Sequence, residues 1–143
     1  LLTNGYLYPP VDSFDEIKVS IKAFSYQVHK YYTGKSNRRV LRNFKSIYEN
    51  APEKLSAETV LIPGLVDIDE IERIAKFISS IDPTIPLRID CYWPVVPNTP
   101  WRAPTREEIR SAVISARKYL ENVHFLSSDA KVIGKVHNLW PIE

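Results

Sequence analysis

Short runs of branched residues alternate with amphipathic helical patterns along this chain, and that alternation limits the folds that it can adopt. Strands are predicted at 17–21, 59–62 and 87–92, with the tail of an earlier strand at 1–3 and a further candidate at 123–126. Parallel strands need a crossover between them, so strands that alternate with helices predict βα units and a parallel sheet. The chain is therefore assigned to the α/β class, and an open sheet and part of a (β/α) barrel both fit the pattern.

Three segments between these strands have the apolar spacing of helices. The first follows Asn37, which is expected to cap it, and the second begins near Asp67. The third begins at Thr105, and Glu108 three residues later completes a capping-box pattern. The apolar positions of the three are Val40, Leu41, Phe44, Ile47 and Tyr48; Ile68, Ile71, Ile74, Ala75, Ile78 and Ile81; and Ile109, Ala112, Val113, Ala116 and Leu120. With 143 residues, a single domain over 1–143 is expected.

The composition excludes several kinds of site. The single cysteine, Cys91, excludes an intrachain disulfide and any metal cluster held only by this chain's thiolates, and it favours a reducing, cytoplasmic compartment. His29, His124 and His137 have no spacing that indicates a metal site. No apolar run approaches the roughly 18 residues of a membrane span, so no membrane association is expected. The absence of methionine and the strand-like first residues predict a fragment of a longer protein.

In both architectures ligands bind at the carboxyl ends of the strands. That rule selects residues 3–5, Lys22, residues 63–64 and residues 92–94. A lysine at a strand end costs free energy unless it meets an anion, so Lys22 is the strongest single candidate for a ligand contact. The alternative is a lysine that only reaches solvent.

An irregular loop rich in proline follows the strand at 87–92. It carries Tyr92, Trp93 and Trp101. Such a loop is expected to be either a lid over a substrate or a hydrophobic plug over the sheet, and the sequence does not distinguish the two.

Gly34-Lys35-Ser36 resembles the end of a phosphate-binding loop, but the pattern is incomplete. The motif needs a glycine five residues before Gly34, and His29 stands there. A turn that leads into the next helix is the better interpretation. The surrounding segment 17–48 holds eight Lys or Arg and no acid, which indicates either a solvated helix face or a surface for nucleic acid or an acidic partner.

Three motifs, in this order and spacing, resemble a known family. They are "TNG" at 3–5, "IKAFSYQVHKYYTGKSNRRVLRNFKSI" at 21–47 and "TVLIPGLVDIDEIERIAKFISSI" at 59–81. Over roughly residues 1 to 126 the chain resembles the C-terminal part of the pyruvate formate-lyase activating enzymes of the radical S-adenosylmethionine (SAM) superfamily. The resemblance implies a partial (β/α) barrel with outer helices. It also implies a 4Fe–4S cluster, held by a C-x₃-C-x₂-C loop in the N-terminal part, that reduces SAM to a 5′-deoxyadenosyl radical.

The resemblance also implies roles for individual residues. Lys22 matches a lysine that contacts the amino-acid end of SAM, and Asn4 and Gly5 match the turn after the preceding strand. In the activating enzymes the radical abstracts hydrogen from a glycine of a partner protein, so a protein substrate is expected. The three cluster cysteines are absent, and this chain alone is therefore expected to be inactive.

Four positions depart from the family. Leu2 and Ser20 stand where the family often has aspartates, and these serve a monovalent-cation site that is not expected here. Glu58 stands where an arginine is expected, and Trp93 where a histidine is expected. These departures leave open an alternative function, a module that binds RNA or an acidic protein on a scaffold that has lost catalysis.

Overall fold

A single parallel sheet organises the protein, seen here in a computed structural model that describes residues 1–95 and 98–126. Its strands are β1 (Leu2–Thr3), β2 (Ile17–Ser20), β3 (Leu55–Leu61), β4 (Leu87–Cys91) and β5 (Val123–Leu126). They lie in the order β1-β2-β3-β4-β5, and every neighbouring pair is parallel. This order has no reversal, as in the wall of a (β/α) barrel and unlike a doubly wound sheet. The predicted α/β class and partial barrel are confirmed.

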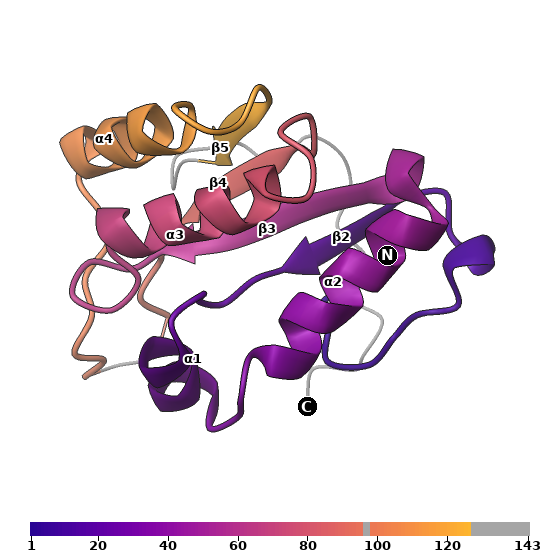
Figure 1. Ribbon diagram of the computed structural model, residues 1–143. Helices are drawn as coiled ribbons and strands as arrows, with labels where there is room; N and C mark the ends of the chain where they lie inside the picture. The colour runs from indigo at the N-terminus through magenta and orange to yellow at the C-terminus, as the bar shows by residue number, and fades with distance from the viewer. Residues whose placement is uncertain (96–97, 127–143) are drawn as a thin grey trace, which may run out of the picture.

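Four α-helices connect these strands or precede the last of them. They are α1 (Tyr26–Thr33), α2 (Arg38–Asn50), α3 (Ile68–Ser79) and α4 (Arg106–Ala116), with short 3₁₀ turns η1 (Val11–Ser13) and η2 (Pro52–Lys54). Figure 1 shows α2, α3 and α4 along one face of the sheet, with α1 apart from them near the strand tips. The three predicted helices are confirmed, and α1 is an addition to the prediction. None of the described helices is long and apolar enough to cross a bilayer.

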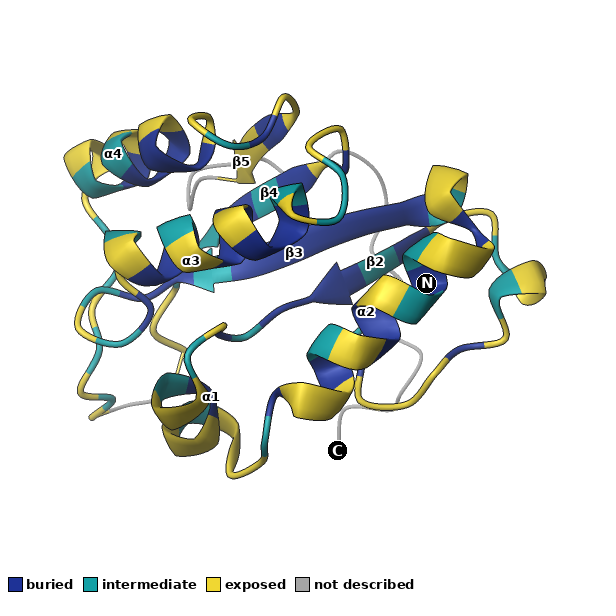
Figure 2. Ribbon diagram, viewed as in Figure 1, coloured by how far each residue is buried: buried dark blue, intermediate teal, exposed yellow. Residues whose placement is uncertain are grey.

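The two faces of the sheet differ in chemistry. Side chains that alternate along the strands toward the helices are apolar and buried, among them Val19, Ala57 and Ile89. Figure 2 shows this core as the buried ribbon of β3 and the inner sides of α2 and α3. The alternate positions of β2, β3 and β4 are polar with the exception of Val60: they are Lys18, Ser20, Ser56, Glu58, Arg88 and Asp90. A parallel sheet is usually apolar on both faces, so the polar residues of this face are unusual for a sheet of this kind.

Helix α2 begins where predicted, but the expected cap is wrong. Asn37 precedes the helix, yet its side chain does not cap it and donates instead to the carbonyl oxygen of Phe24. The hydroxyl of Ser36 accepts from the Arg38 amide at 3.2 Å.

Gly34 ends α1 in the left-handed conformation, with φ of 72°, and its amide donates to the Lys30 carbonyl oxygen at 2.8 Å. The turn interpretation of Gly34 is confirmed. The capping box of α4, Thr105 with Glu108, is also confirmed.

Glu72 joins α3 to α4. Its carboxylate lies 2.8 Å from the Lys76 ammonium and accepts from the hydroxyls of Ser115 and Tyr119, each at 2.9 Å. The hydrogen bond from Lys76 is the largest of the effects that hold the pKa of Glu72 at about 2, below its ordinary 4.5. A carboxylate with a lowered pKa stabilises the folded state above the unfolded pKa and loses that contribution as pH falls toward the folded pKa.

We therefore expect Glu72→Gln to remove part of the acid sensitivity of the protein between pH 4.5 and about 2. Urea denaturation at several pH values across that window measures it. The wild-type free energy of unfolding should fall more steeply with decreasing pH than that of the variant. Glu121→Gln, at an exposed position outside the helices, is the matched control. Equal slopes for wild type and Glu72→Gln would contradict the assignment.

Candidate functional site

A cavity of about 290 Å³ opens at the carboxyl ends of β1 and β2. Its lining residues are Asn4, Tyr6, Lys22, His29, Thr33, Lys35 and Val40. Two residues predicted from the sequence, Asn4 and Lys22, therefore meet in one cavity. Tyr6, His29, Thr33 and Lys35 were not predicted as site residues, and they come from the turn after β1 and from α1 and the segment that follows it.

The turn after β1 is built by its own side chains. The Gly5 amide donates to the Thr3 hydroxyl at 3.2 Å, and the Tyr6 amide donates to the Asn4 side-chain oxygen at 3.0 Å. From α2, the Asn43 amide donates to the Gly5 carbonyl at 2.9 Å. These contacts use the oxygen of Asn4, and none of the hydrogen bonds recorded for the described residues uses its amide nitrogen. Asn4 is exposed, and its contact with a cofactor stays a prediction.

Gly5 is buried beneath the turn and does not line the cavity. Its φ is 70°, and a Cβ at this position would lie 2.8 Å from Val19 Cγ1 and 3.2 Å from Val40 Cγ1. Both the backbone conformation and the packing require glycine here. The structure thus gives Gly5 a backbone role, and its predicted contact with a cofactor stays a prediction.

We expect Gly5→Ala to lower the free energy of unfolding by about 2–3 kcal/mol, from the positive φ together with the clash. Chemical denaturation measures the loss. Gly34→Ala is a closely matched control, because Gly34 has φ of 72° and a Cβ at that position would meet no atom within 4 Å. Gly34→Ala should therefore show the conformational cost alone. Equal losses in the two variants would remove the packing argument.

The loop that carries Lys22 is fixed by a buried carboxylate of α3. The amides of Phe24 and Ser25 donate to Glu70 Oε1 at 2.6 and 2.5 Å, and the Ser25 hydroxyl donates to Oε2 at 2.6 Å. Burial raises the pKa of Glu70, but these hydrogen bonds and one from Arg73 outweigh it, so the pKa lies below its ordinary value. Glu70 thus stays charged at the entrance of α1 and holds the backbone two residues after Lys22.

Lys22 is half-buried and takes part in none of the ion pairs found within residues 1–95 and 98–126. Lys22 lines the cavity, and none of the other lining residues carries a carboxylate. A partly buried, unpaired cation is costly unless an anion meets it. The geometry supports the prediction that Lys22 receives an anionic group.

His29 is a structural part of the cavity wall. It is buried, and its Nδ1 lies 2.9 Å from the Lys35 carbonyl oxygen and 3.1 Å from the Thr33 hydroxyl. A carbonyl only accepts, so Nδ1 carries the proton. His29 thereby ties α1 to the turn that leads into α2.

The loop after β4 crosses to α1 through aromatic contacts. The Tyr92 and Trp101 rings lie 6.2 Å apart in an edge-on arrangement, and Trp101 meets Tyr32 of α1 at 6.1 Å. Trp93 is separate and 60% exposed. Of the three predicted loop residues, the structure brings together Tyr92 and Trp101 and leaves Trp93 outward. Tyr92 and Trp101 pack against the core as a plug would, and their contact with a substrate stays a prediction.

Glu58 belongs to a network on the polar face of the sheet. Its register neighbours are Ser20 on β2 and Arg88 on β4. The Ser20 hydroxyl donates to Glu58 at 3.1 Å, and the Arg88 guanidinium donates to Glu58 at 2.5 Å and to Asp90 at 2.7 and 2.9 Å. The resemblance led us to expect an arginine at position 58. The guanidinium on this face instead belongs to Arg88 of β4, and Glu58 accepts a hydrogen bond from it.

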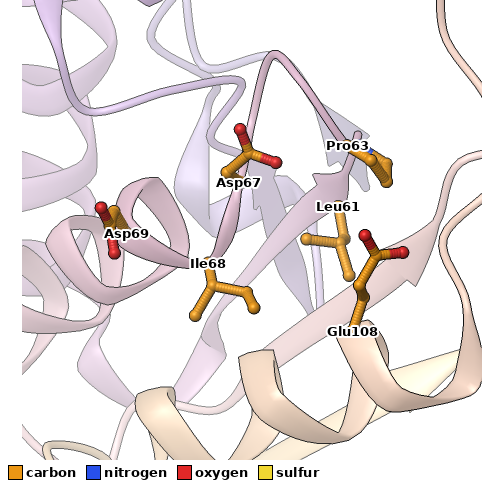
Figure 3. A pocket seen from close by; sticks show the side chains of 6 residues that line it. All are labelled: Leu61, Pro63, Asp67, Ile68, Asp69 and Glu108. Atoms are coloured by element: carbon orange, nitrogen blue, oxygen red, sulfur yellow. The ribbon is translucent and has the colours of Figure 1, made fainter.

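A second cavity, of about 240 Å³, lies below the turn after β3 and carries acidic side chains (Figure 3). Asp67 accepts from the Gly64 amide at 2.9 Å. Glu108 accepts two hydrogen bonds from Arg102, at 2.6 and 2.8 Å, and these are the main cause of its pKa of about 2. The described residues contain no group of three metal-ligating side chains. Asp67 and Glu108 are thus engaged in structural contacts.

Comparison with known proteins finds relatives whose names are those of activating enzymes. A relative from Methanocaldococcus jannaschii named "Putative glycyl-radical enzyme activating enzyme" is 41% identical over 129 residues, which are 86% of this chain and 50% of the relative. Over half of that protein's length, this chain is similar to a protein named as a glycyl-radical enzyme activating enzyme. The indoleacetate decarboxylase activating enzyme of Tractidigestivibacter scatoligenes is 46% identical over 50 residues, 34% of this chain and 16% of that protein. No protein-family model matches.

Two solved structures share the fold of this chain. A domain of the pyruvate-formate lyase-activating enzyme from Bacteroides vulgatus has a TM-score of 0.70 at 18% identity, covering 86% of this chain and 78% of that one. A radical SAM methyltransferase from Sphaerobacter thermophilus has a TM-score of 0.73 at 18% identity, and the match covers 90% of this chain and 40% of that one. The resemblance stated from the motifs is confirmed. The chain spans half the length of its archaeal relative.

Proposed function

We propose that this chain is the C-terminal part of a longer radical SAM protein of the activating-enzyme type, which cleaves SAM reductively and acts on a partner protein. The observation that carries the proposal is the cavity at the strand carboxyl ends, where Asn4 and the unpaired Lys22 meet. The name of the archaeal relative supports the activity, and the polar sheet face beside β2 and β3 is consistent with a ligand in the barrel interior.

The residues of the cavity fit the amino-acid end of SAM. That end carries a carboxylate, which the Lys22 ammonium would meet in a charge-assisted hydrogen bond. The Asn4 amide nitrogen would supply a second donor. The volume of about 290 Å³ is near the lower limit for small-molecule pockets, as expected for one end of a ligand. When bound, SAM would supply the 5′-deoxyadenosyl group that its reductive cleavage releases.

The iron–sulfur cluster does not fit this chain alone. A cluster site of the C-x₃-C-x₂-C kind needs three thiolates, and the chain has one cysteine, Cys91, half-buried at the end of β4. The cluster ligands would therefore lie outside residues 1–143. We infer that this chain alone does not cleave SAM.

We assign the loop after β4 as the surface that contacts the partner protein. Trp93 is its exposed aromatic side chain, and Tyr92 and Trp101 hold the loop against α1. The relatives' names include an enzyme that activates indoleacetate decarboxylase, which supports a protein partner.

The test is anaerobic expression of the full-length protein with reconstituted iron and sulfide. We expect an absorbing iron–sulfur cluster and formation of 5′-deoxyadenosine from SAM under reducing conditions. A protein with neither cluster nor SAM cleavage would overturn the enzymatic proposal.

We expect Lys22→Ala in that protein to weaken SAM binding by about 10-fold or more, which corresponds to the loss of one hydrogen bond to a charged group. Equilibrium dialysis with labelled SAM measures the affinity. Lys22→Arg should retain part of it, because the charge remains. Lys118→Ala, an exposed lysine after α4, is the control. Unchanged affinity in Lys22→Ala would remove the role of Lys22 while leaving the family assignment intact.

A further inference from the structure

A third cavity, of about 340 Å³, is lined by arginines. Its lining residues are Tyr6, Ser36, Arg38, Arg39 and Arg42. Arg38 and Arg39 begin α2, and Arg42 lies one turn later on the same side as Arg38. Tyr6 also lines the cavity that holds Lys22, so the two cavities are neighbours.

The arrangement is electrostatically unfavourable without an anion. No acid lies in the first turn of α2, and the positive end of the helix dipole adds to the charges of Arg38 and Arg39. Like charges four residues apart, as in Arg38 and Arg42, destabilise a helix further. None of these arginines takes part in an ion pair within the described part of the chain. All three arginines are exposed, as on a solvated helix face, and all three also line one cavity.

One of the arginines is held in place by an aromatic ring. The guanidinium carbon of Arg39 lies 4.8 Å from the centre of the Tyr6 ring, a cation–π contact. The Tyr6 backbone amide donates a hydrogen bond to the Asn4 side-chain oxygen, which holds the Tyr6 backbone in the turn after β1. The cavity is therefore lined by one arginine whose guanidinium contacts a ring, Arg39, and by two further arginines of the same helix. The side chain of Asn37, which would have occupied the helix end, points to Phe24 instead.

We propose that this cavity binds a phosphate group of a small ligand, with Arg38 and Arg42 as its main charge partners and Arg39 as a third donor. Guanidinium groups bind phosphate oxygens through paired hydrogen bonds, and three of them match a dianion better than a single carboxylate. The three arginines line one cavity of about 340 Å³, a volume that suits a small phosphate compound better than RNA or an acidic peptide. It differs from the proposed SAM site in its charged groups, because it uses neither Lys22 nor Asn4, although Tyr6 lines both cavities.

The probes are inorganic phosphate and inorganic pyrophosphate, titrated calorimetrically into the chain at low salt. We expect saturable binding that weakens at least 10-fold in Arg38→Gln and in Arg42→Gln. Arg110→Gln, an exposed arginine of α4, should bind as wild type does. No saturable binding of either probe, or equal weakening in Arg110→Gln, would overturn the proposal. So would tighter binding of a single-stranded RNA or a glutamate-rich peptide than of pyrophosphate at equal charge.

A charge reversal separates a binding role from a structural one. Arg38→Glu places an acid at the helix N-terminus, so the free protein should melt at a higher temperature while phosphate binding is lost. A lower melting temperature would show that Arg38 stabilises the fold and would overturn the argument from unfavourable charge. SAM binding by the full-length protein should be unchanged in Arg42→Gln, so failure of one site is distinguishable from failure of the other.

Discussion

Arg88→Met is expected to lower the free energy of unfolding by about 3 kcal/mol, because it removes the cation that compensates a buried carboxylate. The Glu58 side chain is 7% exposed and lies 2.5 Å from the Arg88 guanidinium. Ser20 remains as its other donor, but a hydroxyl does not neutralise the charge. Asp90 loses both of its hydrogen bonds from Arg88 in the same step. Urea denaturation at neutral pH measures the loss.

The double variant Glu58→Met/Arg88→Met tests the cause. Replacing both partners of a buried ion pair by apolar side chains is often far less costly than removing one. We therefore expect the double variant to be more stable than Arg88→Met alone. Arg110→Met, at an exposed position, should cost little. A double variant that is less stable than Arg88→Met would contradict the view that the unpaired charge dominates the loss.

The same network explains an error in the strand boundaries. The sequence predicts the third strand at 59–62, whereas β3 runs over Leu55–Leu61. The missed residues include Ser56 and Glu58, which alternate with buried Leu55 and Ala57. An acidic residue favours the prediction of a loop when its partner is unknown. The partner of Glu58 is Arg88, which lies 30 residues away in the sequence. Only the register of β3 with β4 brings the two together.

Helix α1 was missed for a related reason. It has eight residues and buries only His29 among them. A helix of this length has no repeated apolar stripe, and tertiary contacts stabilise it instead. Those contacts are Glu70 at its start and the bond from His29 to the Lys35 carbonyl beyond its end. Neither partner is marked by local sequence, although both lie where the family motif runs.

The candidate site shows what a topological rule can and cannot predict. Asn4 and Lys22 were found because the carboxyl ends of neighbouring parallel strands lie at one edge. The contact of Tyr6 with Arg39 joins residues 33 positions apart through the packing of α2, and no periodic pattern indicates it. The basic segment 17–48 was visible as a charge imbalance, but its concentration into one cavity depends on the start of α2.

Glu70→Ala is expected to cost about 3 kcal/mol of folding free energy and to loosen the loop that carries Lys22. The carboxylate is 3% exposed and accepts from two backbone amides and a hydroxyl, and alanine leaves these donors without an acceptor. Each unsatisfied buried donor costs about 1–3 kcal/mol, and water that reaches part-buried groups offsets part of the sum. Denaturation measures the stability.

Amide hydrogen exchange locates the effect. In Glu70→Ala the amides of Phe24 and Ser25 should exchange faster by more than those of β3 or α4, because they lose their acceptor directly. Glu70→Gln keeps one acceptor oxygen but not the charge, so it should be intermediate in both measurements. Glu107→Ala, at an exposed position in the first turn of α4, is the control. If exchange in Glu70→Ala rises equally across the whole protein, Glu70 stabilises the fold generally and does not position the Lys22 loop.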